Sequence, residues 1–493
     1  MKKYLFITLV TITLILTVTT SCSDEFVDPK AAYSIDSENY FNSKEDYDQA
    51  LIATYDLLQS TYVNVLLGEI ASDNTLAGGE SPTDVIGFQQ VDDMIHTEVN
   101  SNLRDVWNWM FAGVQRANYI LEFQNKTDFA GKTQLIAETR FLRAYYQFEL
   151  VKWFGGIPMK GDVRFKIGDE KTIPRSSVAE VYASIEADLV FASANLSPIA
   201  AQKGRVTKGA AQALLGKAYL FQGKFSQAAS TLQALINTSP YSLETDYNKM
   251  FELDGENGPE SVFEVQYTDV EGAGFGCLQC SEGNVAVGFS GIRNYSGPVF
   301  SSGFSFNLPT QESSDAFETG DKRKAVAILD IAAWAGANSG VSYGKGNEDT
   351  GFFNRKYLPR KRSDDAAGDL NLTNPNNYRA IRYADVLLMA AEAYNRGEID
   401  DAKAREYLNQ VRRRAFGDNN HDITASGAAL TDFILAERRV ELFGEGHRFF
   451  DLVRTGKAVG TISGFTANKN ELFPLPIEEI QFANGNWEQN PGY

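Results

Sequence analysis

The sequence predicts a mainly α-helical protein, a right-handed array of tetratricopeptide-like helix pairs interrupted by an irregular, loop-rich subdomain. One observation is a repeat. Residues 209–242 have the length of a tetratricopeptide unit, and Leu215, Gly216 and Tyr219 fit its Leu-Gly-x-x-Tyr element. The other is a contrast in composition, because residues 257–377 are rich in Gly, Ser and Asn and hold only short β-like pieces. Since stacked helix pairs form a curved solenoid, we expect this segment to be inserted into a solenoid.

Helices are expected throughout the N-terminal part of the chain. Ser43 and Asp46 form a capping box that begins the first of them. Further helical periods cover residues 101–123, 133–154 and 177–195. Residues 68–90 are rich in Ser, Asp, Gly and Asn, which predicts an irregular stretch between the helices.

A degenerate second repeat is expected over residues 378–416. Its first helix should carry an apolar stripe, formed by Ile381, Ala384, Leu388, Ala391 and Tyr394. Within the loop-rich segment, residues 261–267 and 351–357 favour strands. Loop-rich segments of this length are usually functional or disordered, and the many aromatic residues argue against disorder here.

Cys277 and Cys280 stand in a Gly-rich part of this segment. In an exported protein such a C-x-x-C pair either closes a small disulfide loop or stays free. A zinc site would need two more ligands, and His96, His421 and His447 are not in ligand spacing. We expect neither a metal nor a cofactor.

The N-terminus predicts export. Lys2 and Lys3 precede an apolar run over residues 5–18, which is typical of a signal peptide and too short for a membrane-spanning helix. Cys22 lies where lipid modification would follow signal-peptide cleavage, although Thr19 replaces the usual Leu of the recognition sequence. If Cys22 carries a lipid, that lipid would be the only attachment of the mature chain to a membrane. The alternative is an ordinary signal peptide that is cut nearby.

The composition excludes some partners and favours others. The formal net charge is −18, so the chain offers no basic patch for nucleic-acid phosphates or for an anionic lipid surface. The sequence contains 22 Tyr, 32 Phe and 5 Trp. Part of this aromatic excess belongs to the core, but exposed rings are also the side chains on which sugar rings stack.

A densely charged stretch near the C-terminus allows two interpretations. Its charged members include Glu437, Arg438, Glu441, Arg448 and Asp451. Two carboxylates one helical turn apart could serve a glycosidase. Carboxylates surrounded by arginines, however, are ion-paired and ionised, which is wrong for a general acid. We therefore expect a structural ion-pair motif that clamps the last helices together, and no catalytic residue.

After residue 22 the chain resembles the SusD/RagB family of outer-membrane nutrient-binding lipoproteins of Bacteroidetes. The resemblance rests on several motifs together rather than on one. They lie at residues 137–146, 153–158, 204–215, 306–317, 382–388, 437–456, 474–479 and 489–493. The first reads Ala-Glu-Thr-Arg-Phe-Leu-Arg-Ala-Tyr-Tyr, and the last reads Gln-Asn-Pro-Gly-Tyr.

The resemblance implies a non-catalytic lipoprotein on the outer face of the outer membrane, with a helical, tetratricopeptide-like fold. It implies that the protein binds oligosaccharides or polysaccharides and delivers them to a SusC-like TonB-dependent transporter for nutrient import. The lipid at Cys22 would be its only membrane contact, and nucleic acid would not be a partner. Peptide binding, as in some members of the family, and a secreted carbohydrate-active enzyme are the alternatives.

The ligand site is expected where loops are long and aromatic, because rings pack against the C–H faces of sugars and polar groups bind their hydroxyls. The family has no short ligand motif that carries over, so the candidates come from the loops alone. They are Asp73, Asn74, Asp84, Phe88, Arg293, Tyr295, Trp334 and Tyr343. For each aromatic candidate the alternative is burial in the core.

These expectations divide the chain into five parts. They are a signal peptide (1–21), a lipid-anchored tether (22–42), an N-terminal helical region (43–256), the loop-rich subdomain (257–377) and a C-terminal helical region (378–493).

Overall fold

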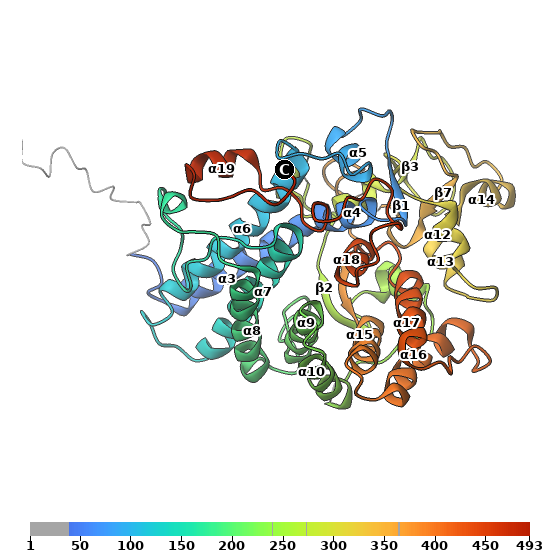
Figure 1. The fold of residues 1–493 in the computed structure, drawn as a ribbon. Helices are drawn as coiled ribbons and strands as arrows, with labels where there is room; N and C mark the ends of the chain where they lie inside the picture. Colours follow the sequence, from blue (N-terminus) through green and yellow to red (C-terminus); the bar gives the residue numbers. More distant parts are fainter. Residues whose placement is uncertain (1–38, 239, 273, 363–364) are drawn as a thin grey trace, which may run out of the picture.

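The computed structural model describes residues 39–238, 240–272, 274–362 and 365–493 (Figure 1). The expected signal peptide (1–21), the lipidation site Cys22 and most of the expected tether lie outside these residues. Among the helices that the structure describes, none combines the length and the apolar character needed to cross a lipid bilayer.

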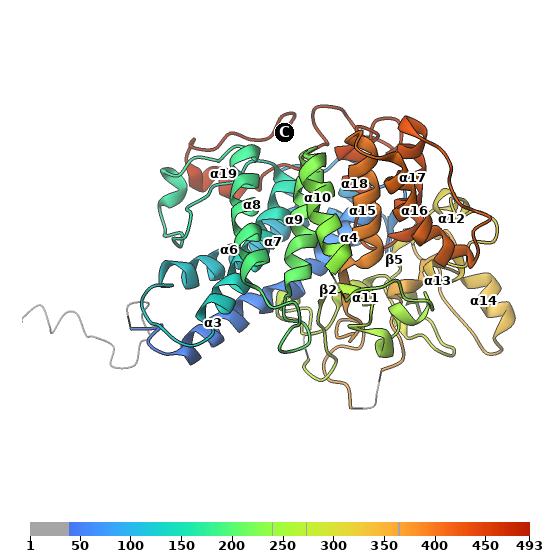
Figure 2. The ribbon, with the colours of Figure 1, turned by 90° about the horizontal axis from the view of Figure 1, so that it is seen from below.

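The long helices form a continuous array, as the sequence predicts. They are α3 (Lys44–Asp56), α6 (Ser101–Glu122), α7 (Lys132–Phe154), α8 (Val178–Asn195), α9 (Lys208–Phe221), α10 (Phe225–Thr238), α15 (Tyr383–Arg396), α16 (Asp401–Phe416) and α17 (Gly427–Glu441). The capping box that begins α3 is confirmed, since the Ser43 and Asp46 side chains each accept from a backbone N–H of the other. Figure 2 shows α8, α10, α15 and α17 side by side. Because α10 packs directly on α15, the segment between them is an excursion from the array.

The two predicted repeats are helix pairs. In the pair α9–α10, a Cβ at Gly216 would lie 2.5 Å from Leu232 Cδ2, so glycine allows the two helices to approach closely. The pair α15–α16 is the second repeat. Its expected stripe is wrong at Ile381, which lies on the strand β8 (Tyr378–Arg382). Pairing of β8 with the distant strand β2 decides the conformation of Ile381, and such pairing cannot be seen in a helical period of the sequence.

The shorter helices lie between and after the array helices. They are α4 (Tyr62–Ile70), α5 (Ile86–Asp92), α11 (Val285–Phe289), α12 (Gln311–Asp315), α13 (Lys324–Ala327), α14 (Ile331–Ala337), α18 (Arg448–Arg454) and α19 (Ile477–Ala483). Short 3₁₀ turns are η1 (Leu57–Thr61), η2 (Asp169–Lys171), η3 (Lys249–Phe251), η4 (Leu253–Gly255), η5 (Leu278–Cys280) and η6 (Arg355–Tyr357).

The described residues form four two-stranded sheets. The antiparallel pairs are β1 (Thr75–Gly78) with β5 (Phe306–Pro309), β2 (Ser261–Val265) with β8, and β6 (Ile328–Asp330) with β7 (Phe352–Asn354). The parallel pair is β3 (Ile292–Arg293) with β4 (Ser302–Gly303). The two segments predicted as strands, 261–267 and 351–357, contain β2 and β7, so both predictions are confirmed in part; residues 355–357 form the 3₁₀ turn η6 instead.

The prediction of an irregular stretch over residues 68–90 is partly wrong. The end of α4, the strand β1 and the start of α5 all lie within it. Every residue of α4 is buried, so the helix has no polar face to give an amphipathic period. The strand β1 exists through its register with β5, in which Thr75 is opposite Pro309. A partner so far along the chain leaves no local signal.

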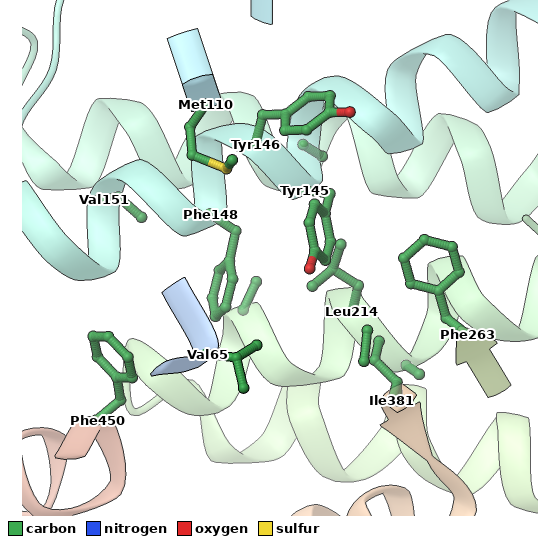
Figure 3. Packing of buried hydrophobic residues seen from close by; sticks show 14 of the residues in the cluster. Val65, Met110, Tyr145, Tyr146, Phe148, Val151, Leu214, Phe263, Ile381 and Phe450 are labelled. Atoms are coloured by element: carbon green, nitrogen blue, oxygen red, sulfur yellow. The ribbon is translucent and has the colours of Figure 1, made fainter. Parts of the chain in front are cut away.

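One large apolar core ties the array to the loop-rich segment. Its members come from helices before that segment, from the strand β2 within it and from the strand β8 just after it, as Figure 3 shows for Val65, Tyr145, Leu214, Phe263 and Ile381. A smaller apolar cluster lies within the loop-rich segment and includes Ile292, Tyr295 and Phe353. Each loop therefore rests on a packed base, which fixes the side chains that the loops present.

Candidate functional site

The carboxylates of the C-terminal charged stretch are buried and ion-paired. Arg323 Nη1 lies 2.6 Å from Glu437 Oε1 and 2.9 Å from Glu441 Oε2, and the two carboxylate side chains are 1% and 0% exposed. Burial raises the pKa of Glu441, but Arg414, Arg382 and Arg323 together outweigh it and hold that pKa far below its usual range. A carboxyl that stays ionised and sealed from solvent does not act as a general acid.

The ion pairs continue across the last helices. Arg438 of α17 donates to Asp385 of α15 at 2.8 Å and to Asp451 of α18 at 2.9 Å. Arg454 of α18 pairs with Asp451 and with Glu392 of α15. Loss of one partner from such a network leaves a buried charge without compensation, so the pairs fix how α15, α17 and α18 pack.

Two candidates for ligand contact, Asp73 and Asn74, extend this network. Arg448 donates to the two Asp73 oxygens at 2.8 and 2.9 Å, and Arg439 Nη2 lies 2.9 Å from Asp73 Oδ2. Arg439 also donates to Asn74 Oδ1 at 3.0 Å. The Asp73 side chain is only 5% exposed. We correct their assignment: arginines from the far end of the chain engage both side chains and join the loop before β1 to α17 and α18.

The assignment of Phe88 as a ligand contact is also corrected. It lies on α5 and is 2% exposed. Its ring centroid is 5.8 Å from that of Phe289 and 5.5 Å from that of Phe306. The ring packs α5 against the loop-rich segment, and burial of this kind leaves no face for a ligand.

The other five candidates lie together. Backbone hydrogen bonds join their segments, because Gly344 N donates to Arg293 O at 2.8 Å and Asn347 N donates to Gly79 O at 2.9 Å. The residues that this pairing gathers are Asp84, Arg293, Tyr295, Trp334 and Tyr343. We call residues 79–84, 293–296, 331–337 and 342–347 the loop face. Figure 1 shows two of its elements, β3 and α14, at the end of the molecule opposite α19.

Arg293 offers hydrogen-bond donors at the loop face. Its Nη2 donates to Phe304 O at 2.7 Å and lies 3.8 Å from Asp84 Oδ2, and its Nη1 lies 3.6 Å from Glu80 Oε2. Its Nε is buried and has no hydrogen-bond partner within the described part of the chain, so it is not a donor that a ligand can reach. The donors left for ligand hydroxyl groups are those of Nη1 and Nη2, beside two carboxylates that can accept.

Trp334 supplies an aromatic surface that a buried tyrosine supports. Trp334 Nε1 donates to Tyr295 Oη at 3.0 Å, and Tyr295 Oη donates to Pro298 O at 2.8 Å. The Phe300 ring packs behind Trp334 with a centroid distance of 5.3 Å. Trp334 and Tyr343 are half-buried, whereas Tyr295 is almost fully buried. Trp334 and Tyr343 are thus the rings that can face a ligand, and Tyr295 positions Trp334.

Sequence reasoning missed several polar groups of the loop face. Glu80 approaches Arg293, and at the border of the loop face the Glu348 carboxylate accepts from Gly78 N at 3.3 Å. Asn347 is present through its backbone bond to Gly79. The Gly-rich composition of residues 344–351 signals a loop, but only the fold shows that this loop meets residues 79–84.

Cys277 and Cys280 form a disulfide, which decides between the two alternatives that their spacing leaves open. The loop that carries them also presents Phe275, whose ring centroid lies 6.0 Å from that of Phe304. Phe304 in turn accepts the hydrogen bond from Arg293. Nowhere in the described ranges do three His, Cys, Asp or Glu side chains gather in a way that could hold a metal ion.

The loop face thus combines half-buried rings, a guanidinium and carboxylates, which are the side chains that suit a hydroxyl-rich ligand. Glu437 and Glu441, the two carboxylates that could have served hydrolysis, are held in buried ion pairs.

Comparisons with known proteins give the family. Residues 310–493 match the SusD family, and residues 25–220 match a family described as "Starch-binding associating with outer membrane". A curated relative, SusD-like protein P2 of Formosa agariphila, is 27% identical over the full length of both chains. A solved structure titled laminarin binding SusD-like protein is 35% identical, with a TM-score of 0.84 over 92% of this chain and 100% of that one.

The chain belongs to the SusD family. Another solved relative is surface glycan-binding protein A from Bacteroides thetaiotaomicron in complex with laminarihexaose. It is 25% identical, with a TM-score of 0.79 over 91% of this chain and 99% of that one. Proteins of this family bind glycans without catalysis, so the chain is a glycan-binding protein and not an enzyme.

Proposed function

We propose that this protein is a lipoprotein of the outer cell surface that captures a glycan on its loop face and passes it to a SusC-like TonB-dependent transporter. The observation that carries the proposal is the convergence of Trp334, Tyr343, Arg293 and Asp84 on one surface. The relatives that bind laminarin or laminarihexaose share the whole fold with this chain. Family membership supports the outer-membrane location and import, and the N-terminal sequence supports the lipid at Cys22.

The proposed ligand is an uncharged glycan of the laminarin type. The net charge of −18 disfavours strongly anionic glycans, because like charges raise the cost of encounter. Half-buried rings suit the apolar faces of pyranoses, and Arg293 and Asp84 suit their hydroxyl groups.

The division of the chain at residues 22, 43, 257 and 378 belongs to the same proposal. The loop-rich part, residues 257–377, is then the subdomain that carries most of the loop face.

Two substitutions test the loop face. We expect Trp334→Ala to weaken the binding of laminarihexaose by about tenfold or more, because an aromatic anchor at a binding surface contributes roughly 2 kcal/mol. Arg293→Met should have a similar effect, because it removes the donors but keeps much of the side-chain volume. Isothermal titration calorimetry of the purified protein measures both.

Phe433→Ala is the matched control. Phe433 is an exposed aromatic residue on α17, outside the loop face. This variant should bind the hexasaccharide as the wild-type protein does. Unchanged affinity in both Trp334→Ala and Arg293→Met would show that the glycan binds elsewhere.

A further inference from the structure

A pocket open to solvent lies at the other end of the molecule. It has a volume of about 440 Å³ and is lined by α6, the loop that contains η2, α19 and the segment after α19. We call it the α6–α19 pocket. Figures 1 and 2 both place α19 at the end opposite α14, so this pocket is separate from the loop face.

The walls of the α6–α19 pocket are mainly apolar. Trp107 and Phe111 come from α6, Phe165 and Ile173 from the loop, and Trp487 from the segment after α19. The two tryptophans are only 2% and 6% exposed. They form a floor and offer no flat ring face on which a pyranose could lie. A slim apolar stem suits such a pocket better than a sugar ring does.

Hydrogen bonds hold the loop wall in place from both sides. Trp487 Nε1 donates to Ile173 O at 2.8 Å, and Asn486 Nδ2 donates to the same oxygen at 2.7 Å. On the other side, Gln115 Nε2 donates to Phe165 O at 2.9 Å, and Phe165 N donates to Gln115 Oε1 at 2.7 Å. The pocket is therefore formed before any ligand arrives, which lowers the entropic cost of binding.

Two carboxylates at this pocket lack a positive partner. Glu170 and Glu479 line it and form no ion pair with any residue that the structure describes. Their sequence neighbours are paired, Asp169 with Lys160 and Glu478 with Arg104.

The ionised form of Glu479 is disfavoured in this pocket. Burial raises the pKa of Glu479, and the charges of Glu478 and Glu170 add to that shift, while a hydrogen bond from Trp107 opposes it. Lys166 is the one cation among the described lining residues, and it is exposed at the rim. An arriving cation would relieve the repulsion between these carboxylates.

We propose that the α6–α19 pocket binds the side chain of an arginine presented by a partner protein. The methylene stem would pack against the rings of Phe111 and Phe165, which contact each other edge to face with centroids 6.2 Å apart, as long basic side chains do on apolar surfaces. The guanidinium would bind Glu170 and Glu479 through charge-assisted hydrogen bonds, and its planar face can pack on an aromatic ring. Arginine fits better than lysine, because its fork of donors can serve two carboxylates at once.

Two matched peptides test the proposal on the full chain. Ac-Ala-Arg-Ala-NH₂ should bind in an NMR titration, and its citrulline counterpart, which is neutral and nearly isosteric, should bind at least about tenfold more weakly. The double variant Glu170→Gln/Glu479→Gln should lose about tenfold in affinity for the arginine peptide. Glu478→Gln is the matched control. It removes the same type of charge from a residue that does not line the pocket, so it should retain wild-type affinity. Laminarihexaose should not compete with the peptide.

Several results would overturn the proposal. They are equal affinity for the two peptides, no saturable binding of the arginine peptide to the wild-type chain, an equal loss in Glu478→Gln, and competition by laminarihexaose. If the double variant does not fold, the single variant Glu479→Gln and the citrulline comparison give the same decision. Since the pocket shares no lining residue with the loop face, the test is independent of glycan binding.

Discussion

The guanidinium of Arg323 holds together the two carboxylates that might otherwise be mistaken for a catalytic pair. It donates to Glu437 and Glu441 and also to Asp321, and its side chain is buried. A buried charge network contributes little to stability as a whole, but it is costly to break at one point. We therefore expect substitutions in this network to change the free energy of unfolding.

Arg323→Met should destabilise the protein by about 3–5 kcal/mol, because it leaves three buried carboxylates short of a partner. Urea denaturation measures the free energy of unfolding. Arg413→Ala is the control, since Arg413 pairs with Asp422 on the surface and is 52% exposed. An exposed pair of this kind contributes about 1 kcal/mol or less. Similar losses in the two variants would contradict the structural role of the network.

The sequence allowed only part of the candidate site to be predicted, and the residues show why. Arg293, Trp334 and Tyr343 share a loop-rich segment whose composition marks it as functional, and the fold brings them together. Asp73 and Phe88 have the same polar or aromatic character in a loop-like stretch. What separates them is a distant partner, an arginine for Asp73 and two phenylalanines for Phe88. No local pattern encodes such partners.

At the scale of elements, α5 and β1 support the edge of the loop face. The Asp92 carboxylate, at the end of α5, accepts from Ala77 N of β1 at 2.6 Å. Burial raises the pKa of Asp92 from its ordinary value of 3.8 to about 7, and the nearby charges of Glu348 and Asp93 add to the shift. The carboxyl thus gains a proton in the folded state under mildly acidic conditions.

This shift predicts a pH dependence of stability. Because the folded pKa lies above the unfolded one, the contribution of Asp92 is fully present below about pH 4 and is lost as the pH rises to about 7. Asp92→Asn removes this titration and keeps an oxygen that can accept from Ala77. The stability of the variant relative to wild type should therefore increase by up to about 1.4 kcal/mol per pH unit across that range.

Denaturation curves at a series of pH values measure this difference. Asp93→Asn changes the exposed neighbour and leaves the Asp92 carboxyl in place, so the pH dependence should persist, with its upper limit moved to slightly lower pH because the charge of Asp93 adds to the raised pKa of Asp92. A profile of Asp92→Asn that runs parallel to that of the wild-type protein would show that Asp92 does not titrate in this range.

Elements were predictable where their signal is local. The capping box of α3 and the Leu-Gly-x-x-Tyr element of α9 each depend on residues within a few positions of one another, and both predictions hold. The helix α4 was not predicted because it is buried on all sides, and the strand β1 was not predicted because its pairing with β5 defines it. Pairing across the chain is a property of the whole fold.

At the scale of the whole molecule, a continuous chain of contacts joins the helical array to the loop face. Ion pairs join α15, α17 and α18, and Arg448 of α18 holds Asp73 just before β1. The strand β1 then leads into the loop of residues 79–84. The charged stretch thus supports the base of the loop face, where we propose that the glycan binds. A binding surface on a fixed base loses little entropy when its ligand arrives.

The most direct test of glycan binding at the loop face is a crystal structure of this protein with laminarihexaose. We predict that a sugar ring packs on Trp334 or Tyr343, that a hydroxyl lies within hydrogen-bond distance of Arg293 or Asp84, and that the hexasaccharide is intact. A hexasaccharide bound only at another surface, one cleaved in the crystal, or one that does not bind at all would contradict the proposal.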